Sequence, residues 1–194
     1  MDHNISKGRL EAITDGIIAI AATIMVLELH IPSANDWVGL MEERTTLVAY
    51  IISFFMIYIV WRMHHDLFKT AEIISRKAFL FNGIWLFFLT LVPFTTGWIG
   101  SAADATVPAF LYPLNLLLWS LSFNLLSYQI GKDNPKIKAF TKRITWNRII
   151  MYVGYTISII LSFFLPVWSM RTVGIVTVII VVRLFVSKKS DEEL

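Results

Sequence analysis

Cysteine is absent from this 194-residue chain, which excludes disulfide bonds, a thiolate nucleophile and a cysteine-based zinc site. Charged residues are scarce too, at 16% of the chain, whereas an average soluble domain carries about 25%. Hydrophobic residues make up 56%. A soluble protein of this composition would need a very large core with almost no polar surface, so the sequence indicates a membrane protein.

Motifs for catalysis are also missing. The sequence contains no G-x-S-x-G, no phosphate-binding loop and no paired-carboxylate arrangement. His64 and His65 are followed by Asp66, but adjacent residues point about 100° apart on a helix, and no H-x-x-x-H or H-E-x-x-H spacing exists. We therefore predict that the chain is not an enzyme, and that it holds no cofactor and no resident metal.

Long uncharged runs divide the chain into membrane spans. A spanning helix needs about 20 mostly apolar residues, and runs of this kind recur between the charged residues. No small-residue cleavage site follows the first run, so it is expected to be a retained helix and not a signal peptide. We predict an all-α membrane protein, with one six-helix domain over residues 1–194 and spans at about 10–30, 45–63, 78–100, 107–130, 146–167 and 170–187.

The basic residues predict the orientation of these spans. Of 17 Lys and Arg residues, only Arg44 and Arg171 fall on the side opposite the N-terminus. Because Lys and Arg are enriched in cytoplasmic loops, both termini are predicted to be cytoplasmic, which agrees with an even number of spans. The basic residues then form a rim that faces the lipid bilayer, and no nucleic-acid partner is expected.

The first span carries unusual charges. Six residues separate Arg9 from Asp15, which is about 240° around a helix, so the two cannot pair on one helix face. Each must find partners on other helices, and the candidates at the same depth are Trp61, His64, His65 and Asn82. The sequence predicts a buried polar network joining spans 1, 2 and 3 near the cytoplasmic side. The alternative is that Arg9 and Asp15 are simply solvated at the interface.

Beyond Asp15, the first span carries an apolar stripe with the 3,4 spacing of one helix face, made of Ile20, Thr23, Ile24 and Leu27. The other side of the helix has small residues, which allow neighbouring helices to approach closely. A stripe of branched aliphatic residues commonly faces lipid or a core. Here, however, it includes a threonine, and Glu28 lies at its outer end.

One motif is better explained as an ordinary helix. Thr172–Val176 reads TVGIV, which matches the TVGYG carbonyl filter only in part, because the tyrosine and the last glycine are missing. No pore-helix segment is arranged around it. We interpret it as the beginning of span 6.

The segment Arg9–Asp15, RLEAITD, resembles the R-x-x-x-F-S-D signature of the transmembrane protein 175 family, which comprises the endolysosomal potassium channel and its shorter bacterial and archaeal relatives. The likeness continues through AIAATIMVLEL, WRMHHDLF, Asn82 and LTLVPFTTGWIG, and it covers spans 1–3. Spans 4–6 match in number, length and polarity. Ile13 and Thr14 replace the usual Phe and Ser, keeping an apolar body and a hydroxyl.

This resemblance implies a homotetramer in a prokaryotic plasma membrane, with span 1 lining a central pore that prefers potassium over sodium only weakly. It implies that Ile20, Thr23, Ile24 and Leu27 form a hydrophobic gate and filter, with Glu28 at the outer mouth. It also implies that the polar network consists of Arg9, Asp15, Asn82 and either His64, which we favour, or His65. Permeant potassium is the one metal ion expected.

Two other functions stay open at this point. A proton- or cation-coupled secondary transporter could use Asp15 and a span-2 histidine, although transporters typically show internal repeats and broken helices at mid-membrane, and no repeat is visible here. A structural or lipid-interacting six-helix protein would need no transport pathway at all.

Overall fold

The computed structural model describes residues 6–137 and 145–192. Lys138, Lys142 and Arg143 of the predicted basic rim lie outside this part. The described chain is helical, which confirms the predicted all-α class. Its elements are α1 (Lys7–Ile24), the 3-10 helix η1 (Met25–Glu28), α2 (Trp37–Glu42), α3 (Arg44–Thr70), α4 (Arg76–Thr90), α5 (Val92–Ser101), α6 (Thr106–Asp133), the 3-10 helix η2 (Pro135–Ile137), α8 (Thr145–Ser162) and α9 (Pro166–Glu192).

Five segments of the described chain are long and apolar enough to cross a membrane, namely Lys7–Glu28, Arg44–Thr70, Arg76–Ser101, Thr106–Asp133 and Pro166–Leu184. They overlap the predicted spans 1, 2, 3, 4 and 6. The predicted span 5 falls on α8, an 18-residue helix that packs against α6 and α9.

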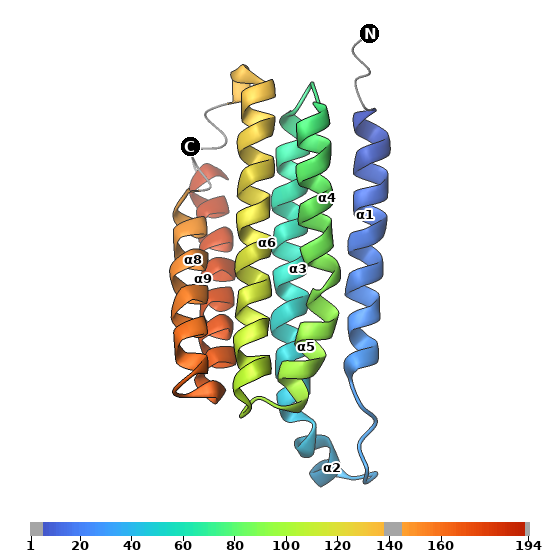
Figure 1. The fold of residues 1–194 in the computed structure, drawn as a ribbon, viewed down its shortest axis with the longest axis vertical. Helices are drawn as coiled ribbons and strands as arrows, with labels where there is room; N and C mark the ends of the chain where they lie inside the picture. The colour runs from blue at the N-terminus through green and yellow to red at the C-terminus, as the bar shows by residue number, and fades with distance from the viewer. Residues whose placement is uncertain (1–5, 138–144, 193–194) are drawn as a thin grey trace.

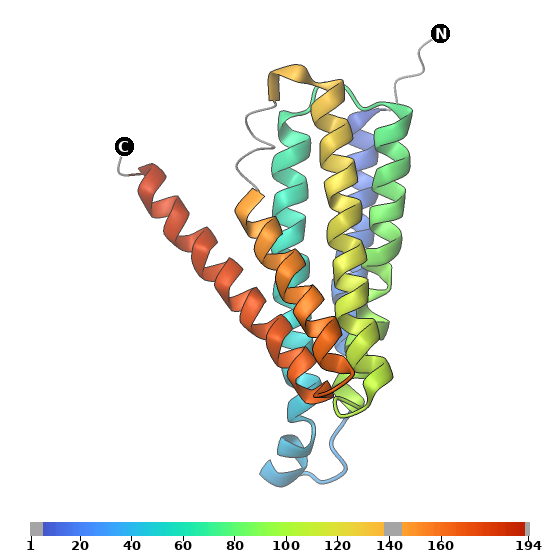
Figure 2. The same cartoon turned by 60° about the vertical axis from the view of Figure 1, so that its left-hand side comes forward.

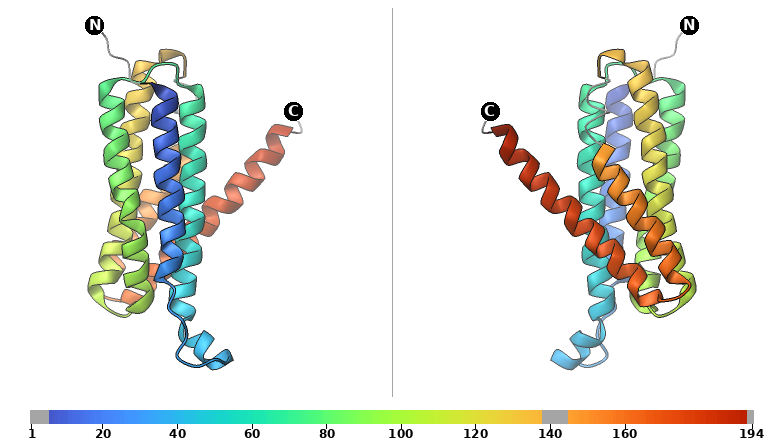
Figure 3. Two further views of the ribbon diagram at one scale, coloured as in Figure 1. Left: turned by 90° about the vertical axis from the view of Figure 1, so that its right-hand side faces the viewer. Right: turned by 90° about the vertical axis from the view of Figure 1, so that its left-hand side faces the viewer.

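The helices form an elongated bundle with α1 at one edge and the α8–α9 pair at the other (Figure 1). α1 lies over the junction between α3 and α4, which it contacts along its length (Figure 3, left). α9 crosses α8 obliquely, and its C-terminal half diverges from the bundle (Figures 2 and 3). The edge position of α1 leaves one face of this helix uncovered by its own chain.

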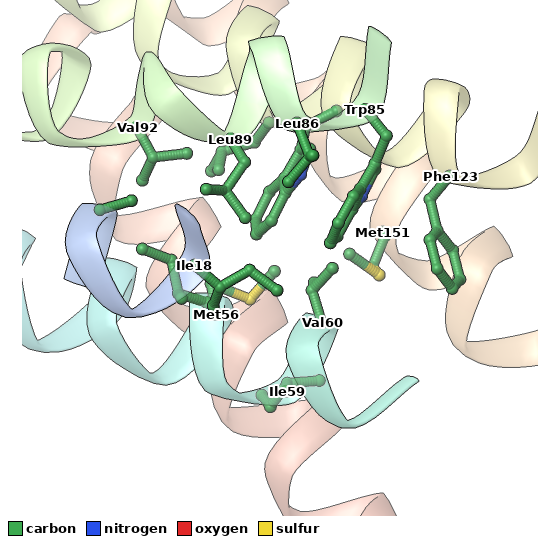
Figure 4. Packing of buried hydrophobic residues seen from close by; sticks show 14 of the residues in the cluster. Ile18, Met56, Ile59, Val60, Trp85, Leu86, Leu89, Val92, Phe123 and Met151 are labelled. Carbon is green, nitrogen blue, oxygen red and sulfur yellow. The ribbon is translucent and has the colours of Figure 1, made fainter. Parts of the chain in front are cut away.

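Aromatic side chains fill the centre of the bundle. Trp85 and Trp119 are fully buried, and their rings stack with centroids 6.1 Å apart. Figure 4 shows Trp85 among side chains of neighbouring helices, including Met56 and Val60 of α3, Phe123 of α6 and Met151 of α8. Large aromatic residues bury much apolar area, so these mid-span tryptophans serve packing.

Two predicted spans end or break differently from expectation. The predicted span 78–100 is divided into α4 and α5 at Leu91, because Pro93 has no N–H to bond to the preceding turn and its ring crowds that turn. The Leu91 N–H bonds instead to Phe88 O at 3.3 Å. In span 1 the α-helix ends at Ile24 and tightens into η1, which ends at Glu28 and not at residue 30.

Asn134, just after α6, fastens the α3–α4 connection. Its Oδ1 accepts hydrogen bonds from the backbone N–H groups of Glu72 (2.9 Å) and Ile73 (2.8 Å). Its Nδ2 donates to Ile73 O and Ile130 O, both at 2.9 Å. One buried side chain thus satisfies four main-chain groups and ties the α3–α4 connection to the end of α6.

We expect Asn134→Ala to lower the free energy of unfolding by about 2 kcal/mol, because it leaves buried main-chain groups without partners. Denaturant unfolding in detergent micelles, followed by circular dichroism, measures this. Asn35→Ala, at an exposed position of the loop between η1 and α2, is the control and should stay within about 0.5 kcal/mol of wild type. Equal losses in the two variants would contradict the assignment.

Candidate functional site

α1 has two distinct faces. Leu10, Thr14, Ile18 and Ala21 are buried against the rest of the chain. The four stripe residues are all exposed; Ile20, Ile24 and Leu27 retain 58%, 44% and 76% of their surface. The structure therefore places the whole predicted stripe on one side of α1 and η1, facing away from every other helix of the described chain.

Thr23 is the polar member of this stripe. Its Oγ1 lies 2.9 Å from Ile20 O and 3.0 Å from Ala19 O, so its hydroxyl proton is donated back to the helix. A hydroxyl has two lone pairs besides its one proton. With the proton turned inward to the helix backbone, the oxygen remains an acceptor that can contact a cation on the exposed face.

On the opposite, buried face, Thr14, Asn82 and His64 form a chain of hydrogen bonds across three helices. Asn82 Nδ2 donates to Thr14 Oγ1 at 2.9 Å. Asn82 Oδ1 lies 3.0 Å from His64 Nε2, and in this orientation of the amide the histidine N–H is the donor. All three side chains are at most 2% exposed, so this chain joins α1, α3 and α4 in a dry environment.

Aromatic rings hold the His64 imidazole in place. It stacks on Phe68 with centroids 4.1 Å apart and on Trp85 at 4.7 Å. His65 is exposed and packs near Trp61 at 5.8 Å instead. The different positions follow from the helix, since adjacent residues point about 100° apart.

Asp15 makes a separate contact, with α3. Trp61 Nε1 donates to Asp15 Oδ1 at 3.0 Å. Asp15 also lines an open groove of about 370 Å³ between α1 and α3, whose other lining residues are Ile18, Ala19, Ala22, Phe54, Ile57, Tyr58 and Trp61. The carboxylate is therefore held at the edge of an otherwise apolar groove, outside the Thr14–Asn82–His64 chain.

Like Asp15, Arg9 is a predicted network residue that the structure leaves outside the Thr14–Asn82–His64 chain. Its side chain is exposed, and it has no hydrogen bond or ion pair within residues 6–137 and 145–192. Thr14, conversely, belongs to the hydrogen-bonded chain, although the sequence analysis did not name it as a network residue. Its position directly before Asp15 in the signature was the available signal.

Glu28 lies on a different side of η1 from Leu27. Its carboxylate packs against Gly97 of α5, where a Cβ atom would overlap it. Glu28 is half-buried, whereas Leu27 is 76% exposed. The acid thus flanks the outer end of the stripe without standing on it.

Neither a carbonyl filter nor a metal cluster is visible in the described residues. Thr172–Val176 lies inside α9, where backbone carbonyls bond along the helix, and Thr172 Oγ1 donates to Trp168 O at 2.8 Å. No group of three His, Asp or Glu side chains in the described chain could hold a metal ion. The candidate site therefore consists of the exposed α1 stripe, the Thr14–Asn82–His64 chain and the contact between Asp15 and Trp61.

The N-terminal part of the chain, which contains the candidate site, matches a family of known proteins. The model of the family described as endosomal/lysosomal potassium channel TMEM175 matches residues 9–93. This range includes α1, α3, α4 and the first residues of α5, and hence every predicted site residue.

Similar individual proteins extend the match over most of the sequence. A protein from Chryseobacterium sp. (strain P1-3), named a potassium channel, is 35% identical over 84% of this chain and 85% of its own. A protein of Streptomyces collinus with the same kind of name is 28% identical over 81% and 82%. The crystal structure of a lysosomal potassium-selective channel TMEM175 homolog from Chamaesiphon minutus superposes with a TM-score of 0.77 at 27% identity, covering 91% of this chain and 97% of that one.

Proposed function

The chain belongs to the TMEM175 family and is an integral, multi-pass membrane protein, and we propose that it is a potassium channel whose pore is lined by the exposed stripe of α1. The family predicted from its first helix is thereby confirmed. Its similar bacterial proteins fit a prokaryotic plasma membrane. The exposed stripe Ile20, Thr23, Ile24 and Leu27, on an edge helix with its opposite face buried, is the observation that carries the proposal.

The proposed topology has six crossings with both termini in the cytoplasm. α8 supplies the crossing beyond the five long apolar segments, because it runs antiparallel to α6 and α9 within the same bundle (Figure 2). The distribution of Lys and Arg supports this orientation, since Arg44 and Arg171 alone fall on the outer side.

The proposed assembly is a homotetramer with α1 nearest the fourfold axis. One chain leaves the α1 stripe without a partner and leaves an apolar groove between α1 and α3 open. Four copies arranged around an axis would turn the four stripes toward each other. The groove would then lie where a neighbouring copy can fill it.

Within such a pore, rings of Ile20, Ile24 and Leu27 side chains exclude water when the pore is narrow, and so gate by dewetting. A ring of Thr23 hydroxyls replaces part of the hydration shell of a cation. Potassium sheds water more easily than sodium does, so an apolar constriction favours it modestly. Glu28, beside the outer end, raises the local concentration of cations, an effect that salt screens.

A coupled transporter and an enzyme are both less well supported. The similar bacterial proteins are named channels, and channels need neither a counter-ion cycle nor a catalytic residue. His64, the histidine that a proton-coupled mechanism would use, is stacked between two rings and hydrogen-bonded to Asn82. Reversal potentials that follow the potassium gradient without an obligatory counter-ion would separate a channel from a carrier.

We expect Ile20→Ala and Leu27→Ala to raise potassium flux through reconstituted liposomes and to reduce potassium selectivity, because smaller rings lower the barrier to wetting. A lowered barrier of about 1.4 kcal/mol corresponds to roughly tenfold faster flux. The measurement is potassium-driven flux, with sodium as the competing ion, at matched protein content.

The control is Ile175→Ala on α9. Ile175 is 55% exposed, against 58% for Ile20, but its helix, α9, lies at the opposite edge of the bundle from α1 (Figure 1). It is expected to leave flux unchanged. If all three variants conduct like wild type with the same selectivity, the pore is not lined by α1.

A further inference from the structure

Arg9 lies on the same face of α1 as the exposed stripe, nearer the N-terminal end of the helix. It precedes Ile20 by 11 residues and Thr23 by 14, which at about 100° per residue brings both side chains within about 40° of the direction of Arg9. Gly16, seven residues after Arg9, agrees with it to within about 20°. All four residues are exposed. The stripe is therefore the outer part of a longer exposed face that ends at a guanidinium.

Lys7 anchors the end of α1 that carries Arg9. Lys7 Nζ donates to the backbone oxygen of Ala71, the residue at which α3 ends, at 2.9 Å. Two helical residues turn a side chain by about 200°, so Lys7 faces its own chain and Arg9 faces away from it. The same bond holds the first turn of α1 level with the α3–α4 connection, at one end of the bundle (Figure 3, left). Arg9 therefore marks the inner end of the exposed face.

The charge of Arg9 is not balanced on this face. Among the exposed positions of α1, only Arg9 and Asp15 are charged. Asp15 is about 240° from Arg9 around the helix, and its carboxylate accepts the Trp61 N–H beside α3. A guanidinium keeps its charge at any pH at which a channel works. The exposed face thus has a positive charge at its inner end, whereas the acid Glu28 flanks its outer end.

We propose that the four Arg9 side chains of a tetramer ring the inner mouth of the pore and make potassium flow inward more easily than outward. This inference rests on the proposed function, because it places the α1 face at the pore axis. A positive ring lowers the local concentration of cations within about one Debye length. Potassium that enters from the cytoplasm meets this ring first, whereas potassium that enters from outside first meets Glu28. Entry from the cytoplasm is therefore the slower of the two.

Distance along the helix separates this effect from selectivity. The 11 residues between Arg9 and Ile20 correspond to about 16 Å at a rise of 1.5 Å per residue. The Debye length is only about 10 Å at 0.1 M salt. Gly16, between the two, has no side chain to narrow the pore. Arg9 should therefore change the supply of cations at the mouth and leave the choice between potassium and sodium at the stripe unchanged.

Single-channel currents of the full chain in planar bilayers, with known orientation and equal KCl on both sides, test the proposal. At 0.1 M KCl the wild-type inward current should exceed the outward current. Arg9→Gln should raise the outward current about two- to threefold at 0.1 M KCl and little at 1 M, where the Debye length is about 3 Å. Reversal potentials between KCl and NaCl should stay as in wild type. Arg9→Lys, which keeps the charge, should conduct like wild type.

Arg62→Gln is the matched control. Arg62 is also an exposed arginine, but it lies on α3 and forms an i,i+4 ion pair with Asp66 at 3.0 Å. Its loss changes the net charge by the same amount away from the pore axis, so currents should stay as in wild type. An outward current that rises equally in Arg62→Gln and Arg9→Gln would overturn the proposal.

The absence of cysteine from the chain allows the sign of the charge to be changed within one variant. In Arg9→Cys, a positively charged thiol reagent added from the cytoplasmic side should lower the outward current, and a negatively charged one should raise it. A change of the same sign with both reagents, or no change with either, would contradict the proposal. The wild-type protein supplies a test that needs no variant, because equal inward and outward currents at 0.1 M KCl also overturn it.

The proposed function and this inference fail in different ways. If Ile20→Ala and Leu27→Ala alter flux but Arg9→Gln leaves the outward current unchanged, α1 lines the pore and Arg9 does not control its inner mouth. If none of the three variants has an effect, the pore is not lined by α1, and both proposals are wrong.

Discussion

Asn82→Leu is expected to lower the free energy of unfolding by about 3 kcal/mol and to prevent recovery of a stable assembly from the membrane. Leucine has the same branched arrangement of side-chain heavy atoms as asparagine, but it can neither accept the His64 N–H nor donate to Thr14 Oγ1. Both partners are at most 2% exposed, so water cannot replace the lost bonds. The cost is the desolvation of two buried polar groups at once.

Denaturant unfolding and size-exclusion chromatography in detergent measure the two parts of this effect. Asn35→Leu, at an exposed position in the outer loop, is the control for residue type and should be close to wild type. Combining Asn82→Leu with Thr14→Val gives a sharper test. Thr14→Val removes one of the two groups that Asn82→Leu leaves unpaired, so the double variant should be less destabilised than the sum of the single variants. Strict additivity would mean that the two side chains do not interact.

The sequence was sufficient for the helical class and the approximate position of the long apolar spans. Charged residues bound these runs, and two of them, Arg44 and Lys77, lie at or near helix starts in the structure. Local backbone events were not predictable from hydropathy. The helix of the third span breaks at Leu91, just before Pro93, and the first span tightens into η1 before the extended residue Leu29.

The candidate site was also predictable only in part, because helical periodicity predicts the faces of one helix but not the contacts between helices. Helical angles place Ile20, Thr23, Ile24 and Leu27 on one face, and they show that Arg9 and Asp15 point apart. Which residues meet across helices depends on packing between segments distant in the chain. The Thr14–Asn82 bond spans 68 positions, and the packing of Glu28 on Gly97 spans 69, so neither follows from a local pattern.

Gly100→Ala is expected to destabilise the fold by about 2 kcal/mol, although alanine is the better helix former. A Cβ atom at this position would lie 2.8 Å from Thr46 Cα and 3.2 Å from Thr46 Cβ. Thr46 is in the first turn of α3, and its backbone cannot rotate away as a flexible side chain could. α5 must therefore move away from α3. Because α5 also packs against η1, this movement reaches Leu27 at the outer end of the stripe.

Gly83→Ala is the matched control, because a Cβ atom there meets nothing within 4 Å. Gly83 lies in α4, the helix that precedes α5 in the same predicted span. With no contact to disturb, the helix propensity of alanine should stabilise the protein by about 0.5–1 kcal/mol. The same substitution thus has opposite signs at two positions of one span, and unfolding in detergent measures both. Gly100→Ala should in addition change potassium flux in liposomes, whereas Gly83→Ala should not. A Gly100→Ala protein as stable as Gly83→Ala would mean that α3 and α5 do not approach as closely as the structure shows.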